Sequence, residues 1–208
     1  MAAISGLAIA PAQADATSSM ASLAYAQVGN GPWDTAGGYW SHNRSQSTGC
    51  DGHGGQSHAW CADFVGWIWS HYVARLGSLT DGAARFYAYG QANDTLHSTP
   101  KPGDAVVFEY STGYAEHVAV VTAFDSTTMT VVGGNEGHSS GHTQGIVQRE
   151  STTSWSVGSA PWGQRISGYI CPEQRRQCHP GRGGHDPHGR RRPRRQRQAG
   201  HPRHRGIH

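Results

Sequence analysis

Three short segments carry side chains that, if brought together, would perform nucleophilic catalysis. Cys61 opens an apolar stretch, His117 precedes the run Val-Ala-Val-Val, and Asn135 follows Gly133 and Gly134. A cysteine attacks a carbonyl carbon as its thiolate, and a neighbouring imidazole can hold the proton and return it to the leaving amine. A third side chain with an acceptor oxygen fixes the tautomer and orientation of the imidazole. The three residue types therefore favour a cysteine hydrolase.

The segment around Cys61 predicts the element that must position its thiol. Apolar residues recur at three- and four-residue spacing, which predicts an amphipathic helix over residues 61–73. The first turn of a helix offers unpaired N–H groups and a positive dipole end, and both stabilise a thiolate. The Cys61 N–H is also a candidate oxyanion donor, and Gln56 is a second candidate, although a solvated loop residue is the simpler interpretation of Gln56.

The rest of the pattern predicts an α+β domain. Helical patterns at residues 19–28, 61–73 and 80–87 come before short runs with strand character, which follow a turn signal at residues 100–104. These runs occupy residues 105–110, 118–124, 129–132, 145–149 and 166–170. The spacers between them are too short for crossover helices, so we expect N-terminal helices packed on a mostly antiparallel sheet of about five strands.

Strand parity assigns the third member of the site. Adjacent antiparallel strands place His117 and Asn135 side by side on one face of the sheet, where the two preceding glycines leave room for an imidazole. Glu136 follows Asn135 directly, and successive strand residues face opposite sides. We therefore expect Glu136 to face solvent and Asn135 to orient the imidazole.

Taken together, these segments resemble the CHAP domain, the cysteine, histidine-dependent amidohydrolase/peptidase family of secreted and phage enzymes that cut peptidoglycan. The resemblance covers about residues 21–171 and rests on Trp-Cys-Ala-Asp-Phe-Val, Pro-x-Pro-Gly-Asp-Ala-Val-Val-Phe, His-Val-Ala-Val-Val and Gly-Gly-Asn. It implies a papain-like fold, with Cys61 as the nucleophile, His117 as the general base and Asn135 as the orienting residue. Many members have a glutamate two residues before that asparagine. Gly133 stands there in this chain, so the resemblance does not extend to a four-residue site.

A rival chemistry is available in the segment that leads to the nucleophile. Cys50, His53, His58 and Cys61 are residue types that bind zinc, and a zinc ion here would make Cys61 a ligand. The chain would then be a non-catalytic module that binds the cell wall or is stabilised by zinc. The spacing fits no zinc module that we can name, and Asp51 alone is too little for calcium, so we expect no metal and no other cofactor.

The two ends of the chain differ from its middle. Ala12-Gln13-Ala14 after an apolar stretch fits a signal-peptidase site, so we expect residues 1–14 to be a signal-peptide remnant without its basic start and the protein to be secreted and wall-associated. The catalytic domain would then span residues 15–171. Residues 172–208 hold eleven arginines against two acidic residues, a net charge of +9, and this composition predicts a disordered tail. A spacer, a wall-binding polycation and a frameshift product are all compatible with it.

Charge and hydropathy exclude two classes of partner. Without the tail, the other 171 residues carry a net charge of −6, so the folded part offers no basic face for nucleic acid. No apolar run approaches the roughly 18 residues of a membrane span. We expect a monomer whose partner is peptidoglycan. A Cys50–Cys171 disulfide would tie the long loop to the last strand and leave Cys178 in the tail.

Overall fold

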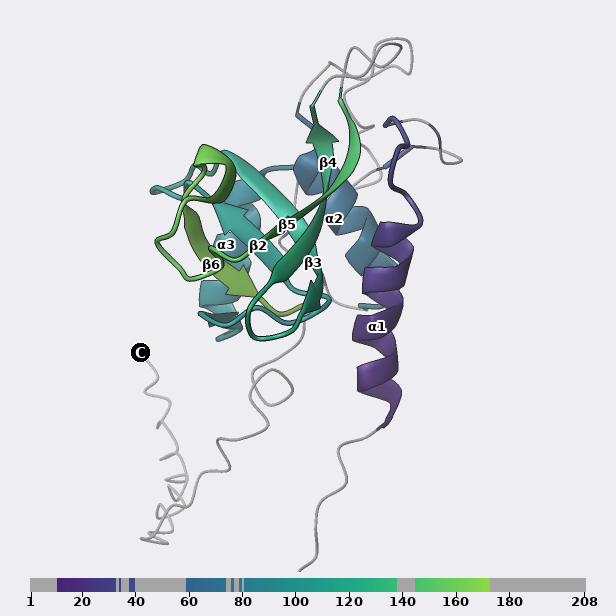
Figure 1. Cartoon of the computed structure of the whole chain (residues 1–208), viewed down its shortest axis with the longest axis horizontal. Helices are drawn as coiled ribbons and strands as arrows, with labels where there is room; N and C mark the ends of the chain where they lie inside the picture. The colour runs from purple at the N-terminus through teal and green to yellow at the C-terminus, as the bar shows by residue number, and fades with distance from the viewer. Residues whose placement is uncertain are drawn as a thin grey trace, which may run out of the picture.

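The computed structural model describes residues 11–32, 34, 38–39, 59–73, 76, 79, 81–137 and 145–172. Within these ranges the chain forms three α-helices, one short 3-10 helix and six strands (Figure 1). The helices are α1 (Pro11–Tyr25), α2 (Cys61–Ser70), α3 (Ala83–Ala92) and the 3-10 helix η1 (Pro161–Gly163). The strands are β1 (Leu96–His97), β2 (Ala105–Phe108), β3 (His117–Phe124), β4 (Met129–Glu136), β5 (Ile146–Thr152) and β6 (Ile166–Ile170).

The six strands form one sheet in the order β1-β6-β2-β3-β4-β5, and each of the neighbouring pairs is antiparallel. This arrangement, with helices before strands, confirms the predicted α+β class and its antiparallel sheet. The sequence predicted five strands, and the sixth is β1, whose two residues are too few to show alternation. β4 also continues to Glu136, beyond the predicted end at Val132, because two glycines hide the strand character of its second half.

Both faces of the sheet are covered, which explains why β2 and β3 read as continuous apolar runs. On one face, α1 packs on β3, α2 packs on β3 and β4, and α3 packs on β1, β2 and β6. The core on that face joins strand valines to helix side chains, including Val118, Val120, Val132, Phe64, Ile68 and Trp69. The alternate strand residues form a second core on the other face, including Val106, Ala119, Val121, Val131, Ile166 and Tyr169. Strand alternation therefore decides which face each residue of β3 and β4 presents.

The bounds of α1 and α2 can be compared with those predicted from the hydrophobic periodicity of the sequence. Helix α2 begins at Cys61 as predicted and ends at Ser70, three residues before the predicted end. The predicted helix at residues 19–28 corresponds to α1, which ends at Tyr25 and is followed by a turn to Gly29 at φ +93°. Figure 1 shows α1 beside α2, and the two helices are in contact. No helix in the described ranges combines the length and apolar character that crossing a membrane requires.

Candidate active site

Cys61 is the first residue of α2. It is a free cysteine with only 4% of its surface exposed. The preceding residue, Trp60, makes no side-chain hydrogen bond to the helix end. The first-turn N–H groups are therefore not capped by the side chain at the N-cap position, where serine, threonine or aspartate usually provides a cap. This is the placement that the sequence predicts for an activated thiol.

The start of α2 is fixed closely against the end of β4. A Cβ atom at Gly134 would lie 2.5 Å from the Trp60 ring and 2.7 Å from the Phe64 Cβ, so only glycine permits this approach. Trp60 also stacks on Tyr39, with ring centroids 5.6 Å apart, and Tyr39 meets Phe64 edge-on at 5.1 Å. This aromatic cluster holds the thiol-bearing end of the helix beside the strand that carries Gly133, Gly134 and Asn135.

His117 opens β3 and is 7% exposed. Its Cα pairs with that of Phe108 across the β2–β3 hairpin, and the two rings lie 5.8 Å apart. A Cβ atom at Gly133 would come within 3.0 Å of the imidazole Nε2 and would clash with the Glu136 carboxylate. Gly133 therefore leaves the room for the imidazole that the sequence predicts, and the same space also admits a carboxylate.

The imidazole contacts Glu136 rather than Asn135. The Glu136 Oε1 atom lies 2.6 Å from His117 Nε2, and the glutamate side chain is 24% exposed. Among the described residues, no hydrogen bond joins the Asn135 side chain to the imidazole. The expectation that Glu136 faces solvent is wrong, and the carboxylate lies where the sequence places Asn135.

A β-bulge explains this exchange. β4 pairs with β5 at Gly133–Gln148 and next at Glu136–Ile146, so three steps along β4 match two along β5. Asn135 lies within this bulge at φ +61°, in the left-handed region that asparagine enters more readily than most residues. One extra residue reverses the parity of the strand end. Glu136 therefore turns to the face that His117 occupies.

The charges around His117 favour its protonated form. Burial lowers the pKa of His117, but the negative charge and hydrogen bond of Cys61 oppose it, as do the hydrogen bond and charge of Glu136. The net effect raises the pKa of His117 from 6.5 to about 10. An imidazolium at neutral pH between a sulfur and a carboxylate is the arrangement that a thiolate–imidazolium pair needs.

A second carboxylate, which the sequence analysis did not single out, interacts with this pair. Glu150 of β5 lies opposite Val131. Burial, then the charge of Glu136, raises the pKa of Glu150, and the charge of His117 lowers it. Strand register was the signal that could have found it, since Glu150 shares a face with Gly133 and with the imidazole.

Several predicted residues lie outside the described ranges. Gln56, the second oxyanion candidate, is one, and so are Cys50, His53 and His58 of the zinc hypothesis. Cys171 is disulfide-bonded to a partner outside these ranges, so its pairing with Cys50 stays a prediction. Within the described residues, no three side chains of histidine, cysteine, aspartate or glutamate are grouped to hold a metal ion.

Comparison with known protein families gives a match that falls on this site. Residues 51–135 match the family model described as CHAP domain. The matched range contains Cys61 and His117 and ends at Asn135, one residue before the glutamate that contacts the imidazole. No curated protein and no solved structure matches the chain significantly. The matched segment, together with the α+β fold around it, identifies residues 51–135 as a CHAP domain.

Proposed function

We propose that this protein is a cysteine hydrolase that cleaves amide bonds in the peptide part of peptidoglycan. The observation that carries the proposal is the contact of one imidazole with a helix-opening thiol and a carboxylate, in residues Cys61, His117 and Glu136. CHAP domains act as amidases or peptidases on peptidoglycan. We assign the third role to Glu136 in place of Asn135 because its carboxylate is the group in contact with Nε2.

The geometry supports a two-step reaction. In the first step the Cys61 thiolate attacks the carbonyl carbon of the scissile amide, and the Cys61 N–H donates to the oxygen that becomes negative. The C–N bond then breaks as the His117 imidazolium gives its proton to the leaving nitrogen, which departs as an amine. The products of this step are a thioester on Cys61 and a neutral imidazole.

The second step restores the enzyme. Neutral His117 takes a proton from a water molecule while the water oxygen attacks the thioester carbon. The C–S bond breaks, the acid product leaves, and the thiolate and imidazolium are formed again. Glu136 keeps the ring in one orientation through both steps and stabilises its charge in the protonated state.

A location outside the cytoplasm is part of the proposal. Cys171 is disulfide-bonded, and structural disulfides persist in oxidising compartments. The apolar stretch and Ala12-Gln13-Ala14 near the start of the chain agree with export. Peptidoglycan lies in the same compartment, so the substrate and the oxidised cysteine lead to the same location.

The proposed function is tested on purified sacculi. Wild-type protein and the Cys61→Ser variant are each incubated with sacculi, and the released fragments are identified by mass spectrometry. We expect wild-type protein to release new amine and carboxyl ends at one type of amide bond, and Cys61→Ser to release none. Binding to sacculi without release by the wild type would instead favour a non-catalytic wall-binding module.

A further inference from the structure

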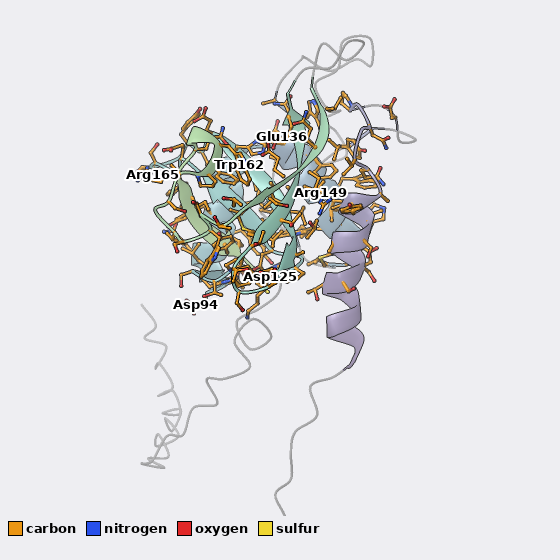
Figure 2. The ribbon with its side chains drawn as sticks, in the orientation of Figure 1. Asp94, Asp125, Glu136, Arg149, Trp162 and Arg165 are labelled. Carbon is orange, nitrogen blue, oxygen red and sulfur yellow. The ribbon has the colours of Figure 1, made fainter. Side chains whose placement is uncertain are left out.

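Trp162 presents a partly exposed indole near the candidate active site. It belongs to η1, and 42% of its surface is exposed. Its ring meets Phe108 edge-on at 6.4 Å, and Phe108 lies 5.8 Å from the His117 ring. The indole centroid is therefore at most about 12 Å from the imidazole centroid. Figure 2 shows Trp162 and Glu136 toward the same end of the molecule, with Asp94 and Asp125 at the other.

The backbone at Trp162 is held in an unfavourable conformation. Its φ of 55° and ψ of 19° lie in the left-handed region, which bulky side chains rarely occupy. Such a conformation persists where the surroundings over-determine it, and it is found preferentially at functional sites. A glycine would adopt these angles without strain, so the indole is kept here at a cost in conformational energy.

The loop that carries the indole is fixed at its base. Arg165 N–H donates to Glu109 Oε1 at 2.6 Å, and Glu109 N–H donates to the Arg165 carbonyl at 2.9 Å. Two backbone hydrogen bonds of 2.8 Å close the loop. The Gly158 N–H donates to the Ile166 carbonyl, and the Ile166 N–H donates to the Ser159 carbonyl. Because Glu109 follows Phe108 directly, the bonds between Glu109 and Arg165 attach the loop to the end of β2, where the Phe108 ring contacts His117. The indole is therefore a preorganised surface, and binding a ligand to it requires little ordering of the loop.

The charges near the imidazole favour an uncharged group on this surface. Glu136 and Glu150 both interact with His117, and the only cation in that trio is the imidazolium. An acidic stretch of peptide would be repelled by this pair of carboxylates, whereas a sugar ring is neutral. A pyranose ring also offers a flat C–H face to an aromatic ring, and the partly exposed indole is a suitable surface for it.

We propose that Trp162 is a positioning residue that stacks on a sugar ring of the glycan strand and so directs the enzyme to the amide that joins sugar and peptide. This inference rests on the proposed function and deepens it by naming the bond. A sugar held within about 12 Å of the imidazole allows the lactyl–peptide amide, which is the first amide after the sugar, to reach Cys61.

The test compares two soluble substrates that share the scissile amide. One is a disaccharide–tetrapeptide, and the other is the same peptide capped by a lactyl group without sugar. With Trp162→Ala, we expect the KM for the disaccharide substrate to rise about tenfold with little change in kcat, and the KM for the lactyl peptide to stay within about twofold. Trp162→Tyr should restore most of the affinity because it keeps an aromatic face.

The matched control is Val157→Ala, in the same loop and with the same 42% exposure. Val157→Ala should leave the KM for both substrates unchanged. A second variant, Trp162→Gly, should have a melting temperature close to that of the wild type, since glycine relieves the left-handed strain. An equal rise in KM on both substrates, or no rise on either, would overturn the sugar contact while the proposed function stands.

A binding measurement separates failure of the inference from failure of the proposed function. Calorimetry with the disaccharide–tetrapeptide compares Cys61→Ala with the double variant Cys61→Ala/Trp162→Ala. Weaker binding by the double variant supports the sugar contact even if the wild type shows no turnover, in which case only the proposed hydrolysis fails. Equal binding by the two variants overturns the contact.

Discussion

Among the described residues, the sheet carries two pairs of a buried histidine and a carboxylate, and only one of these pairs has a thiol beside it. At the edge strand β1, His97 Nε2 lies 3.2 Å from Asp104 Oδ2, with both side chains at most 6% exposed. The His117–Glu136 pair is closer, at 2.6 Å, and its carboxylate is 24% exposed. A buried pair of this kind is therefore not itself the mark of an active site.

The partners of each carboxylate explain the difference. Asp104 also accepts the Lys101 N–H at 2.8 Å, and His97 Nδ1 lies 2.9 Å from the Thr99 carbonyl, so this pair fastens the turn before β2. Burial raises the pKa of Asp104, and the hydrogen bond and charge of His97 lower it. Glu136 has one main task, which is to hold an imidazole that also contacts Cys61. The first pair serves the fold, and the second serves the proposed chemistry.

Replacing the thiol beside the His117–Glu136 pair should cause the largest loss of activity. We expect Cys61→Ala to reduce hydrolysis at least about a thousandfold, since no other nucleophile is in contact with His117 among the described residues. Circular dichroism and the melting temperature should stay close to the wild type because alanine suits the first turn of a helix. Turnover near the wild-type rate would remove Cys61 from the mechanism.

The choice between Glu136 and Asn135 is the next sharpest test. We expect Glu136→Gln to lower kcat/KM by about tenfold or more and Asn135→Ala to lower it less, because only the glutamate contacts the imidazole. A greater loss with Asn135→Ala in the same assay would return the orienting role to the asparagine.

The pH dependence of kcat/KM gives an independent test of Glu136→Gln. Glu136 helps raise the pKa of His117 to about 10, so its removal lowers that pKa. The imidazolium that protonates the leaving amine is then lost at lower pH. The alkaline limb of kcat/KM should therefore move to lower pH in Glu136→Gln, and an unmoved or rising limb would contradict the ion pair.

The first pair should respond in stability and not in rate. Asp104→Ala removes the carboxylate that accepts the Lys101 N–H and pairs with His97, which should cost about 1–3 kcal/mol of unfolding free energy. The kcat of the folded variant should stay within about twofold of the wild type, as determined by activity below the melting transition. A large fall in kcat with unchanged stability would mean that this pair also takes part in catalysis.

Metal removal should have the smallest effect. Since the proposed reaction uses only Cys61, His117 and Glu136, a chelator should leave kcat/KM unchanged. Inactivation by the chelator and recovery with zinc would favour the metal site suggested by Cys50, His53, His58 and Cys61.

The sequence pattern predicted the helix under Cys61 from apolar residues at three- and four-residue spacing, and the strand that His117 opens from a continuous apolar run. It failed at the end of β4. The register at the end of β4 is not fixed by large side chains, because the residues there are Gly133, Gly134 and Asn135. This short sequence is compatible with a regular strand and with a bulged one. The bulge is set by tertiary contacts, namely the close approach of Gly134 to Trp60 and the space for Glu136 at Gly133.

Trp162 was beyond sequence reasoning for a similar reason. Its partner Phe108 is 54 positions earlier, and the loop that contains its left-handed backbone is hydrogen-bonded to Glu109. Neither the distant partner nor the backbone conformation can be predicted from the local hydrophobic pattern of the sequence. The sequence signal was Pro161-Trp162-Gly163, a turn-forming proline and glycine around an aromatic residue.

The bulge in β4 also lets the core and the site vary separately. Up to Val132, the strand keeps the alternation that both cores require, and after the extra residue at Asn135 the alternation restarts with the opposite phase. Removal of Asn135 would abolish the bulge and leave Gly133 and the glutamate two regular strand positions apart, on one face of the sheet. The carboxylate would then stay on the side that His117 occupies and the upstream packing would be untouched, so the strand end can change in length by one residue without moving the carboxylate to the opposite face.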